Sequence, residues 1–479
     1  MIDAMGKALQ EKMTGYQEEM LRHFKALLRI NSVRGERRSG APFGPGNREA
    51  LDYVLGLSRR FGLETVNLDY FAGYSEYGRG QEYVCAVAHL DVVPPGDGWS
   101  HPPFGAQEQD GVIYARGAGD DKPGVIAGLY ALRCMKELGY RPRRRIRVIY
   151  GCAEETGMED MEHYFETQPL PAFGFTPDSD GYDIVNAEKG RMELVLEGQI
   201  PAGSPMAGAA GGVAPNMVPD SAEAVFDTGR LTGEERERLE EALAAPGLKW
   251  TQDGECLTVA FEGVSAHAAM PEEGRNAISL YARFACRVLG ERADPLTRFI
   301  DEYIGFDWGV PRLGIACRDE HMGSLTMNLG LLKTDGRRIW AVGDIRYPTV
   351  TDSRAIQEGL RQKADEEGLG FQVLSAVDGH CCTSERDFAI LREVCLDKGK
   401  PEPRCTAIAG GTYAKKFQGR LVAFGGCGGA VHAPDEFVAI PDFFEHADIV
   451  CYALYRLGGG TDGGTASPAL QHHGPERCG

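Results

Sequence analysis

The sequence predicts an α/β fold in which helices flank a mostly parallel sheet, with a second, α+β domain inserted into the first. Strand-like and helix-like segments alternate between residues 16 and 178, and the same pattern returns near the carboxyl end. The strand-like segments are largely apolar on both faces, which is typical of a sheet covered by helices on both sides.

The first predicted helix covers residues 16–30, "YQEEMLRHFKALLRI", because its apolar residues recur at intervals of three and four. Asn31 and Ser32 end this helix. The segments that follow are assigned from their apolar pattern and length. The predicted strands cover residues 82–90, 111–116, 145–153 and 173–178, and the predicted helices cover residues 123–139 and 157–167.

Between residues 191 and 372 the pattern changes, and we expect a separate, inserted domain there. Its strand-like segments cover residues 192–200, 256–268 and 339–348, and its helix-like segments cover residues 231–245 and 276–290. The remaining residues, 1–190 and 373–457, are expected to form one discontinuous domain. Residues 458–479 have the composition of a disordered tail.

The composition indicates a folded protein that binds neither nucleic acid nor membranes. The chain has 51 Lys and Arg against 70 Asp and Glu, a formal charge of −19, whereas binding to phosphates needs a cationic surface. One basic cluster, Arg141–Arg147, is expected to be a charged lead-in to a strand. The first residues lack the layout of a signal peptide, and no apolar run has membrane-spanning length. Together with 13 scattered cysteines, which suit a reducing compartment, these features predict a cytoplasmic protein.

Polar side chains gather where the predicted strands end. In open α/β sheets ligands bind outside the carboxyl ends of the strands, so we expect these side chains to meet in one crevice. Two further carboxylates, in the run "GAGDDKPG", stand at the start of the predicted helix 123–139. The residues of this group are His89, Asp91, Asp120, Asp121, Glu154, Glu155 and Asp178.

Each of these residues alone has an ordinary structural explanation. Asp120 could cap the helix that follows it, and Glu154 and Glu155 could be a first-turn pair stabilised by a helix dipole. Several carboxylates and a histidine in one crevice, however, are costly to bury unpaired, and a divalent metal would balance their charge. Imidazole and carboxylate ligands without cysteine suit a catalytic zinc site, with manganese and cobalt as alternatives.

An ordered set of short motifs resembles a known family. The motifs are "HLDVVP", "GAGDDKPG", "CAEETG", "TPDSDG", "GVSAHAAMPEEGRNA", "DIRYP" and "VHAPDE". In this order they resemble the co-catalytic di-zinc metallopeptidases that include carboxypeptidase G, aminoacylase, succinyl-diaminopimelate desuccinylase and carnosinase. The segments "NAEKG", "NMVP" and "GGTYA" are most similar to the bacterial peptidase V-like dipeptidases. The resemblance spans residues 16–457 and implies a zinc-exopeptidase-like catalytic domain, residues 1–190 and 373–457, and a lid, residues 191–372.

The resemblance implies two divalent metal ions per chain and a role for each residue near them. The implied ligands are His89 and Asp178 for one ion, Glu155 and His432 for the other, and Asp120 as a bridge. Asp91 resembles the carboxylate that orients the His89 imidazole, and Glu154 corresponds to the general base. In related proteins the peptide bond between the residues matching Asp120 and Asp121 is cis.

The same resemblance implies substrate-binding residues, mostly in the lid. His267 matches a residue that stabilises the oxyanion, and Arg346 matches one that holds the substrate's terminal carboxylate. Asn216 matches a further lid contact, and Gly411 and Thr412 resemble a binding loop. An ordinary structural role stays open for each of the three lid residues. His267 could form a hydrogen bond at a strand turn, Arg346 could form an ion pair at a domain interface, and Asn216 could form a turn.

Two positions depart from the family pattern. Lys122 is followed by Pro123 where the family has glycine, and Ala118 stands where a hydroxyl residue is common. Proline suits the first turn of a helix, so the change can be mild, but the geometry of the loop and the reach of Lys122 are left open.

We therefore expect a metal-dependent dipeptidase that hydrolyses short peptides, with a small peptide as its substrate. An N-acyl amino acid deacylase or desuccinylase would share the same metal site and remains an alternative. A non-catalytic binding protein is the second alternative, although a full ligand set together with Glu154 argues against it. We expect a monomer, and a dimer stays open.

Overall fold

The computed structural model describes residues 2–459, which divide into two compact units. The first unit consists of residues 2–187, 382–406 and 411–459, and the second of residues 188–381 and 407–410. From residue 460 onward, the predicted tail lies outside the described residues. No helix within residues 2–459 is long and apolar enough to cross a membrane.

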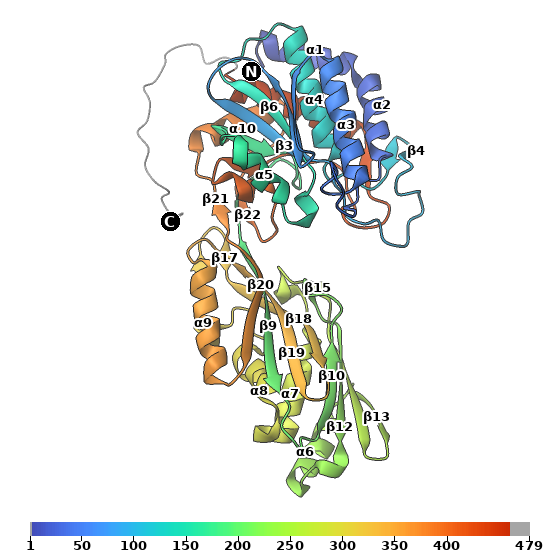
Figure 1. Cartoon of the computed structure of the whole chain (residues 1–479), viewed down its shortest axis with the longest axis vertical. Coiled ribbons are helices and arrows are strands. Elements are labelled where there is room, and N and C mark those ends of the chain that lie inside the picture. Colours follow the sequence, from blue (N-terminus) through green and yellow to red (C-terminus); the bar gives the residue numbers. More distant parts are fainter. Residues whose placement is uncertain (1, 460–479) are drawn as a thin grey trace. The chain divides into compact units, whose positions relative to one another are not determined.

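The first unit is built on a sheet with a parallel centre (Figure 1). Its strands run in the order β1-β2-β6-β3-β7-β23-β8. Strand β3 is parallel to β6 and β7, and β7 is parallel to β23, whereas β1, β2 and β8 pair antiparallel. The bounds are β1 Glu64–Leu68, β2 Ala72–Tyr77, β3 Tyr83–His89, β6 Arg145–Gly151, β7 Phe173–Thr176, β8 Ile184–Glu188 and β23 Leu421–Ala423.

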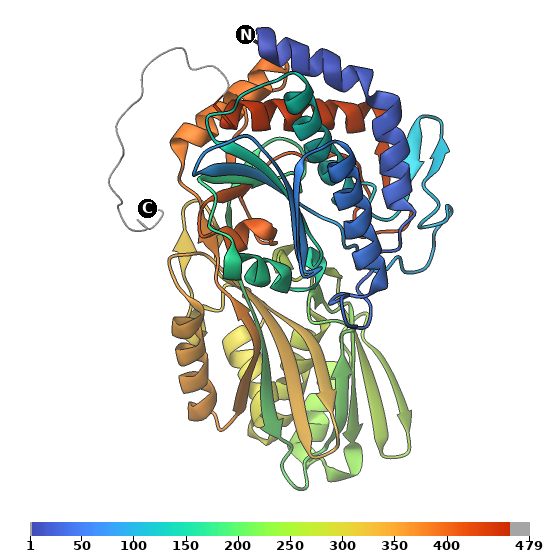
Figure 2. The ribbon, with the colours of Figure 1, turned by 45° about the horizontal axis from the view of Figure 1, so that its top comes forward.

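Helices cover both faces of this sheet (Figure 2). The side chains of β3 alternate between two apolar clusters: Val84 and Ala86 pack with the helices α1–α4, α10 and α11, and Cys85 and Val87 pack with α5. The predicted α/β fold is confirmed. The bounds are α1 Ala4–Gly15, α2 Gln17–Leu28, α3 Pro45–Arg60, α4 Lys122–Glu137, α5 Glu159–Thr167, α10 Glu385–Asp397 and α11 Ile440–Leu457.

A small antiparallel sheet joins two distant segments of the first unit. Strand β5 (Val112–Tyr114) pairs with both β4 (Gln107–Gln109) and β24 (Phe437–Ala439). The sequence did not predict β24 or the helix α1. Both lack a periodic apolar signal of sufficient length, since β24 has three residues and α1 buries only Gly6, Leu9 and Met13.

The second unit is an antiparallel sheet with strand order β13-β14-β12-β10-β18-β19-β9-β20 and with helices packed on it. Strand β20 belongs to this unit through its pairing with β9, so the boundary that we placed at residue 372 falls inside a strand. The strands are β9 Gly190–Gln199, β10 Met206–Gly211, β12 Ser221–Asp227, β13 Lys249–Asp253, β14 Cys256–Glu262, β18 Thr326–Thr334, β19 Arg338–Tyr347 and β20 Gly370–Val377. The helices are α6 Gly233–Leu243, α7 Ala277–Leu289, α8 Pro295–Phe299 and α9 Ser353–Glu366.

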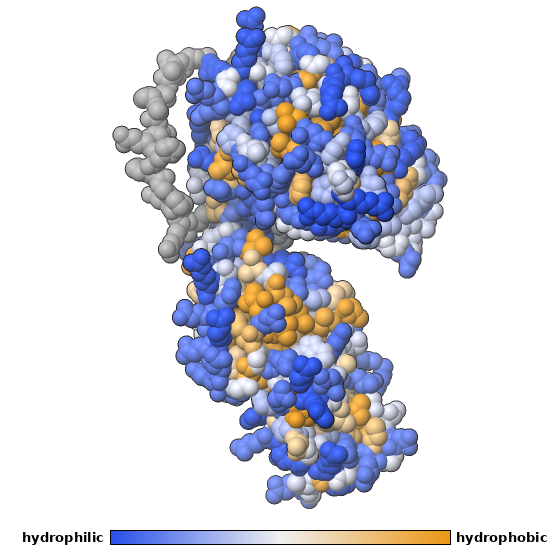
Figure 3. Space-filling model, in the orientation of Figure 1, coloured by the Kyte–Doolittle hydropathy of each residue, from blue (hydrophilic) through white to orange (hydrophobic). Residues whose placement is uncertain are grey.

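Apolar residues gather on one face of this second sheet, over β9, β18 and β19 (Figure 3). Val195, Val342 and Leu331 are direct cross-strand neighbours in these three strands. A separate two-stranded ladder joins β11 (Met217–Val218) to β15 (Ala266–His267).

Candidate active site

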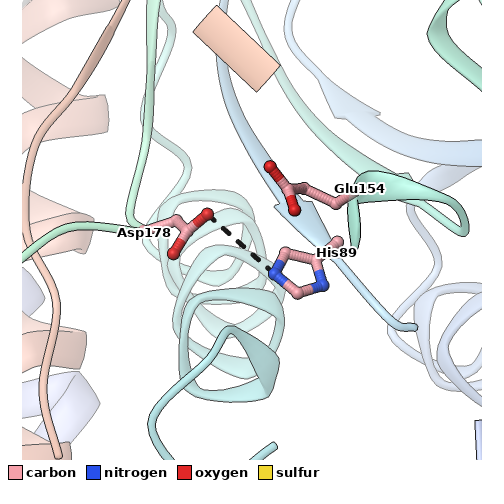
Figure 4. A group of neighbouring side chains, drawn as sticks. All are labelled: His89, Glu154 and Asp178. Atoms are coloured by element: carbon pink, nitrogen blue, oxygen red, sulfur yellow. Dashed lines mark ion pairs between the residues drawn. The ribbon is translucent and has the colours of Figure 1, made fainter. Parts of the chain in front are cut away.

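Three neighbouring parallel strands deliver polar side chains to one edge of the first sheet. Strand β3 ends at His89, β6 leads into the short 3₁₀ helix η1 (Glu154–Thr156), and β7 is followed by Asp178. Because β3 pairs in parallel with both β6 and β7, the carboxyl ends of the three strands meet. In Figure 4 the side chains of His89, Glu154 and Asp178 converge on one space.

Asp120 lies between two histidines. Its Oδ1 is 2.7 Å from Nε2 of His89, and its Oδ2 is 3.0 Å from Nε2 of His432. The same His432 nitrogen is 3.0 Å from Oε1 of Glu155, and the His89 nitrogen is 3.9 Å from Oδ2 of Asp178. One carboxylate therefore separates two clusters, each with an imidazole and a second carboxylate.

These groups are spaced as ligands of a divalent metal would be. The candidate ligand atoms of His89, Glu154 and Asp178 lie within 4.8 Å of one another, and those of His89, Asp120 and Glu155 do so as well. Among the described residues, the buried Oε1 of Glu154 has no hydrogen-bond partner. A donor set of imidazole nitrogen and carboxylate oxygen, with a buried oxygen lacking a partner, fits zinc, manganese or cobalt.

The electrostatics of the cluster favour added positive charge. Hydrogen bonds to Asp120 and Glu155 raise the pKa of His432 to about 10. Burial by itself would lower the pKa of His89, but the Asp120 carboxylate raises it well above its usual range. Burial raises the pKa of Glu154 well above its usual range, and the neighbouring carboxylates add to this effect. These raised pKa values show that the cluster holds protons to balance its negative charge. A bound metal cation would supply the same positive charge.

Asp91 connects His89 to the residues of η1. Nδ1 of His89 lies 2.9 Å from the main-chain oxygen of Asp91 and 3.5 Å from its Oδ1. The Asp91 carboxylate accepts hydrogen bonds from the backbone N–H groups of Glu154 and Glu155, both at 3.1 Å. The imidazole is thus oriented mainly by the carbonyl of Asp91, while the carboxylate holds η1, a task that the sequence did not predict.

The model of peptidase family M20/M25/M40 matches residues 85–456, which is most of the chain. The chain belongs to peptidase family M20/M25/M40. It is 34% identical over 463 residues to a Bacillus subtilis (strain 168) protein described as "Putative dipeptidase YtjP", an alignment that covers 92% of this chain and 97% of that protein.

Solved structures of low sequence identity share the fold of this M20/M25/M40 peptidase. The M20 family metallo-carboxypeptidase Sso-CP2 from Sulfolobus solfataricus has a TM-score of 0.57 at 16% identity, covering 91% of this chain and 98% of that chain. Human carnosine dipeptidase 1 has a TM-score of 0.55 at 13% identity, and the match covers 95% of this chain and 99% of that chain. The predicted family and the predicted enzyme class, a hydrolytic metallopeptidase, are confirmed.

A second carboxylate, Asp160, holds the two residues that lead into η1 of the M20/M25/M40 peptidase. Its Oδ2 accepts hydrogen bonds from the backbone nitrogens of Cys152 at 2.7 Å and Ala153 at 3.0 Å, just before Glu154. The hydroxyl of Tyr413 donates to the same oxygen. The sequence did not predict this pair, because Asp160 lies inside a predicted helix and Tyr413 looks like an ordinary core residue.

Gly411 and Thr412, which the resemblance implied to be a binding loop, precede Tyr413. Thr412 is the N-cap of the 3₁₀ helix that follows, and its Oγ1 accepts a hydrogen bond from the Ala414 N–H at 3.2 Å. Gly411 is exposed. Thr412 therefore has a structural task whether or not this loop contacts a substrate.

The loop "GAGDDKPG" places its residues differently from a simple helix cap. Helix α4 begins at Lys122 after its N-cap Asp121, whose side chain forms no cap hydrogen bond, and the carboxylate of Asp120 lies beside His89 and His432. The peptide bond between Asp120 and Asp121 is cis, as the resemblance implied. Nζ of Lys122 donates to the carbonyl oxygens of Leu27 at 3.2 Å and Ile30 at 3.1 Å, and burial lowers its pKa to about 7.

In the second unit, His267 and Asn216 lie on neighbouring segments. His267 pairs with Met217 across the ladder of β11 and β15, and the Asn216 carbonyl accepts the Ala268 N–H at 3.0 Å. Nδ1 of His267 accepts a hydrogen bond from the Ala269 N–H at 3.1 Å. Partial burial lowers the pKa of His267. Because Nδ1 accepts this bond, the proton of the neutral ring lies on Nε2.

Arg346 is held rigidly in strand β19. Its Nε and Nη2 donate to the two carboxylate oxygens of Asp344 at 2.6 and 3.1 Å, and its Nη1 donates to the carbonyl of Ala409 at 2.6 Å. A guanidinium carries five N–H groups, so these bonds leave one on each Nη. Asp344, which is fully buried, also accepts a bond from Arg191.

Proposed function

We propose that this peptidase is a dipeptidase that hydrolyses short peptides at a centre of two divalent metal ions. The supporting observation is that the two carboxylate oxygens of Asp120 face the Nε2 atoms of two different histidines, His89 and His432. A bridging carboxylate between two imidazoles is the arrangement that two adjacent metal ions need.

Five side chains would hold the two ions. Zinc is the first candidate because the donors are imidazole and carboxylate without thiolate, and manganese and cobalt are alternatives. Bound there, the ions would polarise the scissile carbonyl and lower the pKa of the attacking water. The proposed ligands are His89 and Asp178 for one ion, Glu155 and His432 for the other, and Asp120 for both.

Glu154 is the proposed general base. Its carboxylate would take a proton from the attacking water and later give it to the leaving amine, as the C–N bond breaks. The position of Glu154 supports this role, because its backbone is held by Asp91 while its own Oε1 has no hydrogen-bond partner among the described residues.

The second unit would supply groups for substrate recognition. His267, with its proton on Nε2, would donate to the oxyanion of the tetrahedral intermediate. The two remaining N–H groups of Arg346 would bind the carboxylate at the end of a dipeptide. Asn216 is proposed as a further contact to the substrate, and Gly411 and Thr412 of the first unit as part of a binding loop.

A substrate panel tests this proposal. Purified protein should hydrolyse unblocked dipeptides, lose this activity on treatment with a chelator and regain it with zinc, manganese or cobalt. Hydrolysis confined to N-acetyl and N-succinyl amino acids would overturn the dipeptidase in favour of a deacylase with the same metal site. We expect light scattering to give the mass of a monomer.

A further inference from the structure

A buried carboxylate that the metal site does not use joins two of its loops. Glu436 is 1% exposed, and within residues 2–459 the hydrogen bonds of its carboxylate all go to the segment 116–120. Its Oε1 accepts the backbone N–H groups of Gly119 at 2.8 Å and Asp120 at 3.2 Å. Its Oε2 accepts the Gly117 N–H at 3.1 Å and Nη1 of Arg116 at 2.6 Å.

The same two loops also touch through their backbones. A Cβ on Gly428 would lie 2.8 Å from the Cα of Gly119, which is closer than real Cβ contacts allow. Strands β24 and β5, which flank the two loops, pair directly, and the Ala115 N–H donates to the carbonyl of Glu436 at 3.0 Å.

The loop that carries His432 needs such support. Ala430, His432 and Asp435 have φ values of 53°, 61° and 56°, in the left-handed region that residues other than glycine occupy at a cost. Contacts outside the loop must therefore hold this conformation. Glu436 follows His432 by four residues and supplies one such contact, at the backbone nitrogen of Asp120.

We propose that Glu436 is a positioning residue of the metal centre, which fixes Asp120 relative to His432 and thereby sets the affinity for metal. The inference rests on the proposed roles of Asp120 and His432 as ligands. Arg116 balances the charge of Glu436, and the carboxylate is fully occupied by four donors, so Glu436 is not itself a ligand. It acts through the backbone of the loop that presents Asp120.

Glu436→Gln is the sharpest test, because it keeps the size of the side chain and replaces one acceptor oxygen by an NH₂ group. That group would face two donors and cannot accept from them, so the segment 116–120 would shift. The matched control is Glu76→Gln, because Glu76 is also a buried glutamate. Its carboxylate accepts hydrogen bonds from Nη1 of Arg145 and Nε of Arg147, where strands β2 and β6 pair.

The experiment titrates metal-free full-length protein with Zn²⁺ by calorimetry and records the unfolding temperature of the same metal-free samples. We expect Glu436→Gln to weaken at least one of two binding events by about tenfold or more, whereas Glu76→Gln lowers the unfolding temperature and leaves both affinities unchanged. A second variant, Gly119→Ala, would place a methyl group 3.3 Å from Cγ2 of Val431, the residue next to His432, and should weaken zinc binding in the same direction.

Unchanged zinc affinities in Glu436→Gln and Gly119→Ala would overturn the positioning role, and so would an equal loss in Glu76→Gln, which would show a general effect of stability. These outcomes differ from failure of the proposed function itself. In that case the unaltered protein would bind no zinc or would hydrolyse no peptide.

Discussion

Oδ1 of Asp91 accepts a hydrogen bond from the backbone nitrogen of Glu154 at 3.1 Å. The main-chain oxygen of Asp91 also lies beside the imidazole of His89. Asp91 therefore contacts both a proposed metal ligand and the proposed general base. One side chain thus couples the geometry of a proposed metal ligand to that of the proton acceptor, through the ends of the neighbouring strands β3 and β6.

Asp91→Asn is expected to lower kcat/KM for dipeptides by about 10- to 100-fold. The amide keeps one acceptor oxygen, but its NH₂ group would face the backbone N–H of either Glu154 or Glu155. Steady-state kinetics at saturating metal check this prediction. Asp97→Asn, in an exposed part of the same loop, should behave like the unaltered protein, and an equal loss in both variants would contradict the assigned role.

Glu154→Gln is expected to lower kcat by about 10²- to 10⁴-fold while the protein still binds metal, because the amide cannot accept a proton. Metal content by atomic emission and kcat on one dipeptide, measured on the same sample, check both parts. Equal activity of the variant and the unaltered protein on every peptide and acyl amino acid would remove Glu154 as the base and favour a binding protein.

Arg346→Lys is expected to raise KM for dipeptides, because an ammonium cannot keep both bonds to Asp344 and also bind a carboxylate in a fork. The informative measurement compares each dipeptide with its C-terminal amide. The unaltered enzyme should prefer the free carboxylate by about tenfold or more, and Arg346→Lys should lose most of this preference.

Arg338→Lys provides the control for this comparison, since Arg338 lies on the same strand and pairs at the surface with Asp335. A preference for the carboxylate that survives in Arg346→Lys would place the carboxylate contact elsewhere.

His446 is expected to make the stability of the fold depend on pH. It is fully buried on helix α11, and burial lowers its pKa to about 4. Between the ordinary value of about 6.5 and this value the unfolded chain binds the proton and the folded chain does not, so stability falls as pH falls through this range.

Urea unfolding of metal-free protein at pH 7 and pH 4.5 checks this effect. The free energy of unfolding of the unaltered protein should fall more than that of His446→Leu, by up to about 3 kcal/mol. The difference between the two proteins isolates His446 from the histidines of the metal centre. Identical pH dependence in both would contradict a neutral, buried His446.

The main features of the fold followed from local patterns. Strands β3, β6 and β7 are largely apolar, and parallel strands bring their ends to one edge, so His89, Glu154 and Asp178 could be expected to meet. Short elements such as β24 could not be predicted, because three residues carry no usable periodicity.

The supporting residues were harder to predict than the site residues they hold. Glu436 binds the segment 116–120 across 316 residues of sequence at Asp120, and Tyr413 reaches Asp160 across 253 residues. Such pairs depend on the three-dimensional arrangement of loops. Only the final glutamate of "VHAPDE" gave a signal, and nothing in the sequence said which backbone groups it would bind.

The number of metal ions tests the central claim most directly. Metal-free protein reconstituted with zinc and freed of excess by dialysis should contain two zinc ions per chain, and Asp120→Ala should retain less than one, because both ions lose a ligand. One ion per chain in a fully active enzyme, or two ions retained by Asp120→Ala, would contradict a centre bridged by Asp120.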